Sequence, residues 1–212
     1  MKLSLDRPWL VADLGAALRV LSWSLTKPGF VEARRIVWRE VRNADLPEDL
    51  DAEAWLRAEL AAAGHAEAVA FLTSRDIRRV SHMSHEVEGV WAETVATVGL
   101  SNAERVGHRR THPQGPGTIN IALQLSAPMT DAALIEALSI AVEARTTAVL
   151  EHGPRVAAGP ATGTGTDCVA VAAPAGDLQH AGKHTAIGEA AGRAVLDAVT
   201  RGVQEWMQEQ GD

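Results

Sequence analysis

The opening 42 residues constrain the fold most, because they alternate in character from one position to the next and are broken by a turn sequence. The alternation covers Leu18 to Leu25 and resumes from Ala33 to Val41, with Thr26-Lys27-Pro28-Gly29 between them. Alternation with a period of two is typical of strands, and consecutive strands joined by a short turn are antiparallel neighbours. This part of the chain therefore predicts a β-meander.

The remaining segments predict both strands and helices. Strands are expected at 67–73, at 80–87 and 90–98 as a hairpin turning at Glu88-Gly89, at 117–125, and around Val169 and Val171. Three helices are expected from caps at Asp51, Thr130 and Thr185, ending near Gly64, Leu150 and Gln210. Gly188 and Gly192, four residues apart, suggest close packing of the last helix. We expect an α+β fold: a single domain over residues 1–212, with a mixed, largely antiparallel sheet and about three main helices.

Composition limits the class of protein. The 212 residues are 46% hydrophobic and 22% charged, which fits one domain with a substantial core. A net charge of −7 and the lack of basic clusters beyond three arginine pairs argue against a nucleic-acid partner. Cys168 is the one cysteine, so no internal disulfide can form. No apolar run has the roughly 20 residues of a membrane span, and we read no signal peptide; we therefore expect a cytoplasmic protein without a membrane partner.

A glycine- and threonine-rich stretch, GPATGTGTDCVAVAAP at 159–174, is the strongest indication of a site. Its glycines permit close backbone approach to a ligand, its threonines supply hydroxyls, and Asp167 supplies a carboxylate just before a buried strand. A turn in which Asp167 caps its own backbone explains the same residues. Neither the Walker A pattern nor the spacing G-x-G-x-x-G occurs, so a nucleotide site has little support.

Other polar residues stand in loops or interrupt apolar helices. GLSNAER at 99–105, GTIN at 117–120 and GKHTAIG at 182–188 are loop segments, and Glu143 interrupts a helix of small residues. His184 precedes a helix and can exchange a proton near neutral pH, although a solvated residue fits its position equally well. Cys168 lies within a strand, where a cysteine is usually a small apolar residue. Ser81-His82-Met83-Ser84-His85 lacks a metal-binding spacing, and we expect no protein-bound metal.

Five motifs occur in an order that resembles one family. They are GLSN at 99–102, GTINI at 117–121, EARTTAVLE at 143–151, ATGTGTD at 161–167 and AGKHTAIG at 181–188. Together they resemble the adenosylcobinamide amidohydrolase family, CbiZ, over about Leu21 to Trp206. The stretch 107–116, GHRRTHPQGP, is richer in arginine and histidine than the resemblance implies, so His108 and His112 receive no role from it.

The resemblance implies hydrolysis of the aminopropanol amide of adenosylcobinamide to adenosylcobyric acid and aminopropanol, a corrinoid-salvage reaction towards coenzyme B12. The cobalt belongs to this substrate, and no cofactor is expected. Amide hydrolysis needs an attacking group, oxyanion donors and a proton for the leaving amine. From that chemistry we expect catalysis by Asp167 or Glu143 as general base and by His184 as proton donor. The expected substrate-binding residues are Asn102, Thr118, Asn120, Gly163, Thr164, Gly165 and Thr166.

Several alternatives stay open at this point. Water is the expected attacking group, with Thr164 and Thr166 as the first candidates for a side-chain nucleophile. A non-catalytic corrinoid-binding module would use the same loops, and an amidase for a different amide would share the same fold. The need for the adenosyl ligand, the formation of a homodimer and the order of the strands are not determined by the sequence.

Overall fold

A computed structural model of the chain describes residues 1–42, 45–47, 49–109 and 115–211. The chain begins with the predicted meander, in which β1 (Lys2–Asp6), β2 (Trp9–Ser22) and β3 (Gly29–Glu40) pair antiparallel in sequence order. A register shift between Asp13 and Leu18 interrupts the pairing of β2 with β3. The long strand β2 lets this meander reach the centre of the sheet.

Within the described residues, eight strands form one mixed sheet in the order β4-β3-β2-β12-β8-β6-β5, with β1 beside β2. The members not yet bounded are β4 (Val69–Thr73), β5 (Val80–Val87), β6 (Val90–Val98), β8 (Ile119–Leu125) and β12 (Cys168–Ala173). Only β3–β4 and β8–β12 pair in parallel among the pairings of this sheet; the rest are antiparallel. The predicted α+β fold with a largely antiparallel sheet is confirmed.

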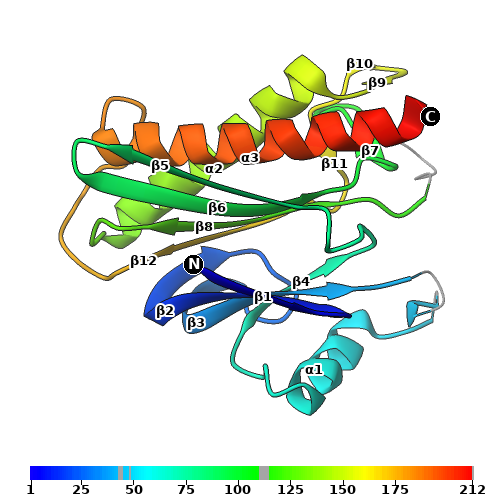
Figure 1. The fold of residues 1–212 in the computed structure, drawn as a ribbon, viewed down its shortest axis with the longest axis horizontal. Coiled ribbons are helices and arrows are strands. Elements are labelled where there is room, and N and C mark those ends of the chain that lie inside the picture. The colour runs from blue at the N-terminus through cyan, green and yellow to red at the C-terminus, as the bar shows by residue number, and fades with distance from the viewer. Residues whose placement is uncertain (43–44, 48, 110–114, 212) are drawn as a thin grey trace.

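Two long helices, α2 (Asp131–His152) and α3 (Ala186–Gly211), lie side by side over β5, β6, β8 and β12, whereas the short helix α1 (Ala52–Ala62) lies beside β3 and β4 (Figure 1). The core beneath α2 and α3 contains Ile121 and Leu123 of β8 with Ala137 and Val199 of the helices. A second apolar cluster on the other face of the sheet includes Trp38 and Phe71, whose rings meet edge to face. The central strands β8 and β12 are therefore buried on both faces.

The helix ends agree with the predicted caps. The Asp51 carboxylate accepts from Ala54 N–H, and the Thr130 hydroxyl accepts from Ala133 N–H. At the start of α3, the Thr185 hydroxyl accepts from Gly188 N–H at 3.0 Å. A Cβ at Gly188 would lie 2.1 Å from the Gly182 carbonyl oxygen, so this glycine does allow close backbone packing. At Gly192 the nearest such contact is an ordinary 3.6 Å, and close packing is not found there.

The direction of β12 separates two groups of loops. The Gly/Thr stretch precedes β12, and the segment 174–185 follows it, so the two lie at opposite ends of the strand (Figure 1). The later segment is bound to the start of α2, since Thr130 N–H donates to Leu178 O and Met129 N–H donates to Pro174 O. Because β8 is parallel to β12, its first residues lie at the same sheet edge as Asp167.

Candidate active site

Three of the four polar loop segments meet at one edge of the sheet. The short strand β11 (Gly163–Thr164) pairs with β7 (Ala103–Glu104), which joins the Gly/Thr loop to GLSNAER. The Thr166 hydroxyl donates to Gly117 O at 2.8 Å, and the Thr118 hydroxyl donates to Thr166 O at 2.9 Å. These contacts join the Gly/Thr loop to GTIN as well, so a site expected from separate motifs forms a connected structure.

Asp167 is the charged group at the centre of this structure, and its side chain is only 5% exposed. One carboxylate oxygen, Oδ1, accepts from Ile119 N–H at 3.0 Å and from the Thr164 hydroxyl at 2.5 Å. The other, Oδ2, accepts from Thr164 N–H at 2.9 Å and lies 3.1 Å from Arg145 Nη1. Asp167 therefore does cap its own loop, as the alternative interpretation held, but it also bonds a strand, a hydroxyl and a guanidinium group.

Burial raises the pKa of Asp167 above its ordinary value, because a charged carboxylate is disfavoured away from water. The Arg145 charge and the hydrogen bonds from Thr164 and Ile119 oppose this shift and lower the pKa. A raised pKa moves a carboxylate closer to the range in which it can accept a proton during catalysis. Such a perturbed group beside a cavity is typical of an active site.

The carboxylate fits its position because residue 163 is a glycine. Its φ is +156°, and a Cβ built there would lie 2.4 Å from Asp167 Oδ2. That distance is shorter than real Cβ contacts, so a side chain would displace either the carboxylate or the loop. Gly163 thus permits the close approach between β11 and Asp167.

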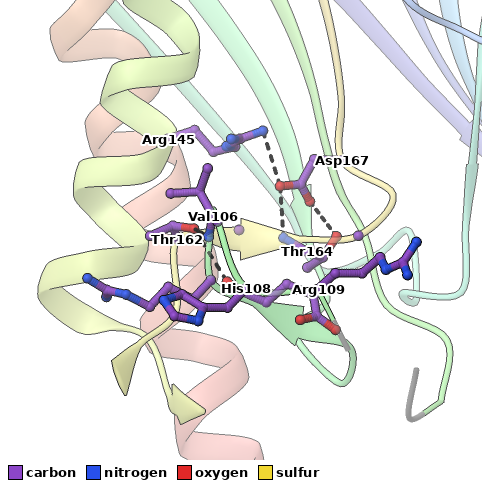
Figure 2. A pocket seen from close by; sticks show the side chains of 12 residues that line it. Val106, His108, Arg109, Arg145, Thr162, Thr164 and Asp167 are labelled. Carbon is purple, nitrogen blue, oxygen red and sulfur yellow. Dashed lines mark hydrogen bonds and ion pairs between the residues drawn. The ribbon is translucent and has the colours of Figure 1, made fainter. Parts of the chain in front are cut away.

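A cavity of about 630 Å³ opens beside Asp167; because of its basic wall we call it the arginine cavity (Figure 2). Its ionisable lining residues are Glu104, Arg105, His108, Arg109, Arg145 and Asp167, and the Gly/Thr loop supplies Thr162 to Gly165. The Arg105 guanidinium donates to Pro160 O at 2.7 Å. The cavity therefore combines a buried carboxylate, hydroxyls and several cationic groups.

A second cavity of about 650 Å³ lies beside the first; we call it the tryptophan cavity. Gly165 and Asp167 line both cavities, so the Gly/Thr loop separates them. Its apolar wall includes Trp23, Leu25, Leu46 and Phe71, and its polar wall includes Asn102, Thr118, Asn120 and Thr166. The paired cavities give an elongated ligand a polar and an apolar compartment.

The predicted substrate-binding residues all line one or both cavities. Asn102, Thr118, Asn120 and Thr166 line the tryptophan cavity; Gly163 and Thr164 line the arginine cavity; Gly165 lines both. Asn120 is 1% exposed, and its amide nitrogen donates to Leu72 O at 2.7 Å. Asn120 thus links β8 to β4, which are not neighbours in the sheet, and this is a structural contact within the site.

Two predicted catalytic residues are not brought to Asp167. Glu143 lies on the exposed side of α2 and forms an ion pair with Lys183, and it lines neither cavity. His184 is exposed just before α3, in the segment that follows β12, and it also lines neither cavity. The GKHTAIG segment therefore contributes helix capping rather than a wall of this site.

Of the six ionisable residues that line the arginine cavity, only Asp167 was predicted as a site residue; the five missed are Glu104, Arg105, His108, Arg109 and Arg145. Arg145 belongs to the same EARTTAVLE motif as Glu143, but two residues along a helix point to different sides. Glu104 lies in the GLSNAER segment, next to the residues that were singled out. His108 lies in a stretch to which the resemblance gave no role; its neighbour in that stretch, His112, lies outside the described residues.

Cys168 is not prepared for nucleophilic attack. Burial raises the pKa of its thiol to about 12, and the adjacent Asp167 charge adds to the shift. The thiol therefore stays protonated at neutral pH, whereas the thiolate is the reactive form. Its place beside the sheet core agrees with the expectation of a small apolar residue.

The described part of the chain contains neither a metal-binding cluster nor a membrane-spanning helix. No group of three or more His, Cys, Asp or Glu residues there has the arrangement to hold a metal ion. No helix in the same part is long and apolar enough to cross a membrane.

Comparison with known proteins gives one curated relative, two similar solved structures and one family model. A curated relative, an uncharacterized protein of Methanocaldococcus jannaschii (MJ1613), is 39% identical over 87 residues, which cover 39% of this chain and 34% of the relative. The match thus spans about a third of that relative's length. The PH0078 protein of Pyrococcus horikoshii OT3 superposes with a TM-score of 0.45 at 10% identity, covering 95% of this chain and 77% of the other. A Burkholderia beta-aminopeptidase gives 0.46 at 13% identity, covering 94% and 78%.

The family model matches nearly the whole sequence. The model described as adenosylcobinamide amidohydrolase, CbiZ, matches residues 2–211. This is the family that the five motifs resemble, and the matched range includes every residue of both cavities. The chain therefore belongs to the CbiZ family of adenosylcobinamide amidohydrolases.

Proposed function

We propose that this chain hydrolyses the amide between the corrin side chain and aminopropanol in adenosylcobinamide, and that Thr164 is the nucleophile. The proposal joins family membership to one observation: the Thr164 hydroxyl donates a 2.5 Å hydrogen bond to the buried Asp167 carboxylate beside a cavity. A hydroxyl bonded to a base, which is held in turn by a third group, is the arrangement that activates weak nucleophiles. Here Arg145 is the third group.

The contacts of Asp167 favour Thr164 over a water molecule as the attacking group. Both carboxylate oxygens already accept two contacts each, from Ile119, Arg145 and Thr164. A carboxylate oxygen has about two lone-pair directions, so little capacity is left for an attacking water. The Thr164 proton, by contrast, already points at Oδ1.

The other loop hydroxyls donate to carbonyl groups, which are not bases. Thr166 donates to Gly117 O, Thr118 donates to Thr166 O, and Thr162 is 3.4 Å from Glu104 O. Of these four threonines, Thr164 is the one whose hydroxyl meets a carboxylate. We therefore assign Thr166 and Thr118 to loop structure and to substrate contact.

Oxyanion stabilisation falls to donors that line the same cavity. The Thr164 N–H donates to Asp167 Oδ2, so it is not free to stabilise the oxyanion. Gly165 lines both cavities, and its N–H has no protein acceptor among the described residues. We propose Gly165 N–H and the Arg145 guanidinium as the oxyanion donors, because both can face charge that develops beside Thr164.

The bond changes balance as an acyl transfer followed by hydrolysis. Thr164 Oγ forms a C–O bond to the amide carbon while its proton passes to Asp167. The C–N bond then breaks, and the leaving nitrogen takes a proton, for which His108 on the cavity wall is the proposed donor. Water then attacks the ester carbon and passes a proton to His108, and Asp167 returns its proton to Thr164 Oγ as the ester C–O bond breaks. This yields adenosylcobyric acid and restores all three groups.

Variants of the loop threonines test this assignment. Thr164→Ser keeps a hydroxyl, so we expect activity within about tenfold of wild type; Thr164→Val removes it, and we expect a loss of about a thousandfold or more. Thr166→Val is the matched control, with a loss below about tenfold. Acid-quenched intact-mass spectra of Thr164→Ser should also contain a corrinoid ester.

Retention of wild-type turnover by Thr164→Val would contradict a threonine nucleophile and return the attack to water. Corrinoid binding by the wild type without any turnover would favour the binding-module alternative. Hydrolysis of simple amides without action on corrinoids would favour a different amidase. Catalysis without a protein-bound metal stays a prediction, which turnover in the presence of a chelator tests.

A further inference from the structure

An exposed tryptophan stands on the wall of the tryptophan cavity and is held in place. Trp23 is 44% exposed, and its indole N–H donates to the main-chain carbonyl of Asp167 at 2.7 Å. Contact between a large apolar ring and water costs free energy, and a ligand that covers the ring removes this cost. The hydrogen bond fixes the ring, so little rotational entropy would be lost when a ligand covers it.

The neighbouring residues extend this surface. Leu25, two positions further along the chain, is 42% exposed and lines the same cavity, while buried Phe71 and half-buried Leu46 supply further apolar wall. Adjacent exposed apolar side chains beside a cavity usually mark a binding surface rather than chance exposure.

The polar wall of the cavity suits amide or amine groups. Asn102 is 7% exposed, and its side-chain oxygen has no hydrogen-bond partner in the described structure. A carboxamide without fixed partners can turn either its oxygen or its nitrogen towards a ligand. A buried polar atom without a partner is also costly, so a ligand that satisfies it gains affinity.

The charge of the lining excludes other ligand classes. Among the described residues that line the cavity, the ionisable ones are Asp167 and Cys168, and none is basic. Phosphates and carboxylates would find no cation in this part of the wall, in contrast to the arginine cavity. A ligand without anionic groups fits the lining better.

We propose that the tryptophan cavity binds a flat conjugated ring that has no anionic groups and carries amide or amine groups, and that the ring stacks on Trp23. The inference rests on the proposed function, because the ring and the scissile amide belong to one substrate that lies across the Gly/Thr loop. Two parts of adenosylcobinamide have this chemistry: the nearly flat corrin macrocycle with its side-chain amides, and the adenine base of the upper ligand. Trp23 is then a specificity-determining residue next to the reacting groups.

Binding measurements on Trp23 variants test the stacking. Trp23→Leu removes the ring and the hydrogen bond to Asp167, whereas Trp23→Phe removes the hydrogen bond and keeps a ring. We expect the Kd for the corrinoid to rise about tenfold or more in Trp23→Leu and about threefold in Trp23→Phe. Trp91→Leu is the matched control, because Trp91 is also partly exposed, at 36%, and lines neither cavity; its Kd should stay within about twofold.

The choice of ligand separates the two sources of the ring. Adenosylcobinamide and cyanocobinamide share the corrin macrocycle, and only the first carries adenine. Weaker binding of both ligands by Trp23→Leu would place the corrin on Trp23, and weaker binding of adenosylcobinamide alone would place the adenine there. Binding is measured by rapid filtration, on a time scale on which little substrate is hydrolysed.

The outcomes also separate stacking from a positioning role and from the proposed function. Unchanged Kd values with a lower kcat in Trp23→Leu and Trp23→Phe alike would overturn stacking, since Trp23 would then act only through Asp167. Turnover by the wild type with unchanged Kd values in both variants would overturn the inference and leave the function standing. Binding that depends on Trp23 without wild-type turnover would support the inference and overturn the function; no binding by the wild type would overturn the inference.

Discussion

Replacing Gly163 with alanine should disrupt the site through one atom. The new Cβ would lie 2.4 Å from Asp167 Oδ2, and the residue would keep a φ of +156° that alanine rarely adopts. Asp167 cannot simply withdraw, because Oδ2 is held by Thr164 N–H at 2.9 Å and faces Arg145 at 3.1 Å. Relief of the overlap must therefore loosen the loop or break these contacts.

The expected cost follows from two contributions. Overpacking of a well-packed position costs about 1–3 kcal/mol. A residue in a sparsely populated backbone conformation costs about 1–3 kcal/mol as well. Because the loop relaxes in part, we expect Gly163→Ala to lower the free energy of unfolding by about 3 kcal/mol, which is about 6–12 °C in Tm for a chain of this size. Displacement of Asp167 should lower kcat by about a hundredfold.

Gly165→Ala is the matched stability control. Nothing lies within 4 Å of a Cβ built at Gly165, and its φ is outside the left-handed region. We expect its free energy of unfolding to stay within about 0.5 kcal/mol of wild type. Urea titrations followed by circular dichroism measure both variants. Equal stability of Gly163→Ala and wild type would refute the steric argument and the tight packing of Asp167 against β11.

Three further predictions follow from the same structure. Asp167 must be ionised to take a proton, so the acid limb of the kcat/KM profile should lie above the ordinary aspartate pKa. Arg145→Met removes a group that lowers the pKa of Asp167, so this variant should have its acid limb at higher pH. An acid limb that does not move in Arg145→Met would exclude Asp167 as the titrating base. Cys168, with a thiol pKa of about 12, should react slowly with iodoacetamide in the folded protein, and Cys168→Ala should stay active; rapid alkylation that abolishes activity would contradict this. Gly188→Ala should destabilise the protein by about 2–3 kcal/mol, because its Cβ would lie 2.1 Å from a carbonyl oxygen. Gly192→Ala should instead stabilise the protein by about 0.5–1 kcal/mol through helix propensity. Thermal melts in which Gly188→Ala is the more stable variant would refute the packing assignment.

The elements of the fold could be predicted because each carries a local signal. The hairpin of β5 and β6 has the predicted bounds, and its turn at Glu88-Gly89 has positive φ at both residues. The caps at Asp51 and Thr130 accept the expected hydrogen bonds. Strand order is a long-range property, and the parallel pairing of β8 with β12 had no local signal in the sequence.

The Gly/Thr loop could be predicted as a cavity wall from its composition, whereas Arg145 could not, because its place depends on the orientation of a helix. Asp167 and Thr164 stood out because glycine and threonine concentrate around them. Glu143 and Arg145 lie two residues apart on α2, and periodicity alone does not tell which side of a helix meets a distant loop. His184 follows β12 whereas Asp167 precedes it, and six strand residues span about 20 Å. Because Asp167 and His184 flank opposite ends of β12, the assignment of this segment as a strand was enough to place them apart.

Product analysis of one reaction tests the central claim most directly. The purified protein is incubated with adenosylcobinamide, with and without a chelator, beside Thr164→Val, and the corrinoids are separated by chromatography with mass detection. We predict that the wild type forms adenosylcobyric acid and aminopropanol in equal amounts in both conditions, and that Thr164→Val forms neither above background. Unchanged adenosylcobinamide after incubation with the wild type would contradict amide hydrolysis at this site.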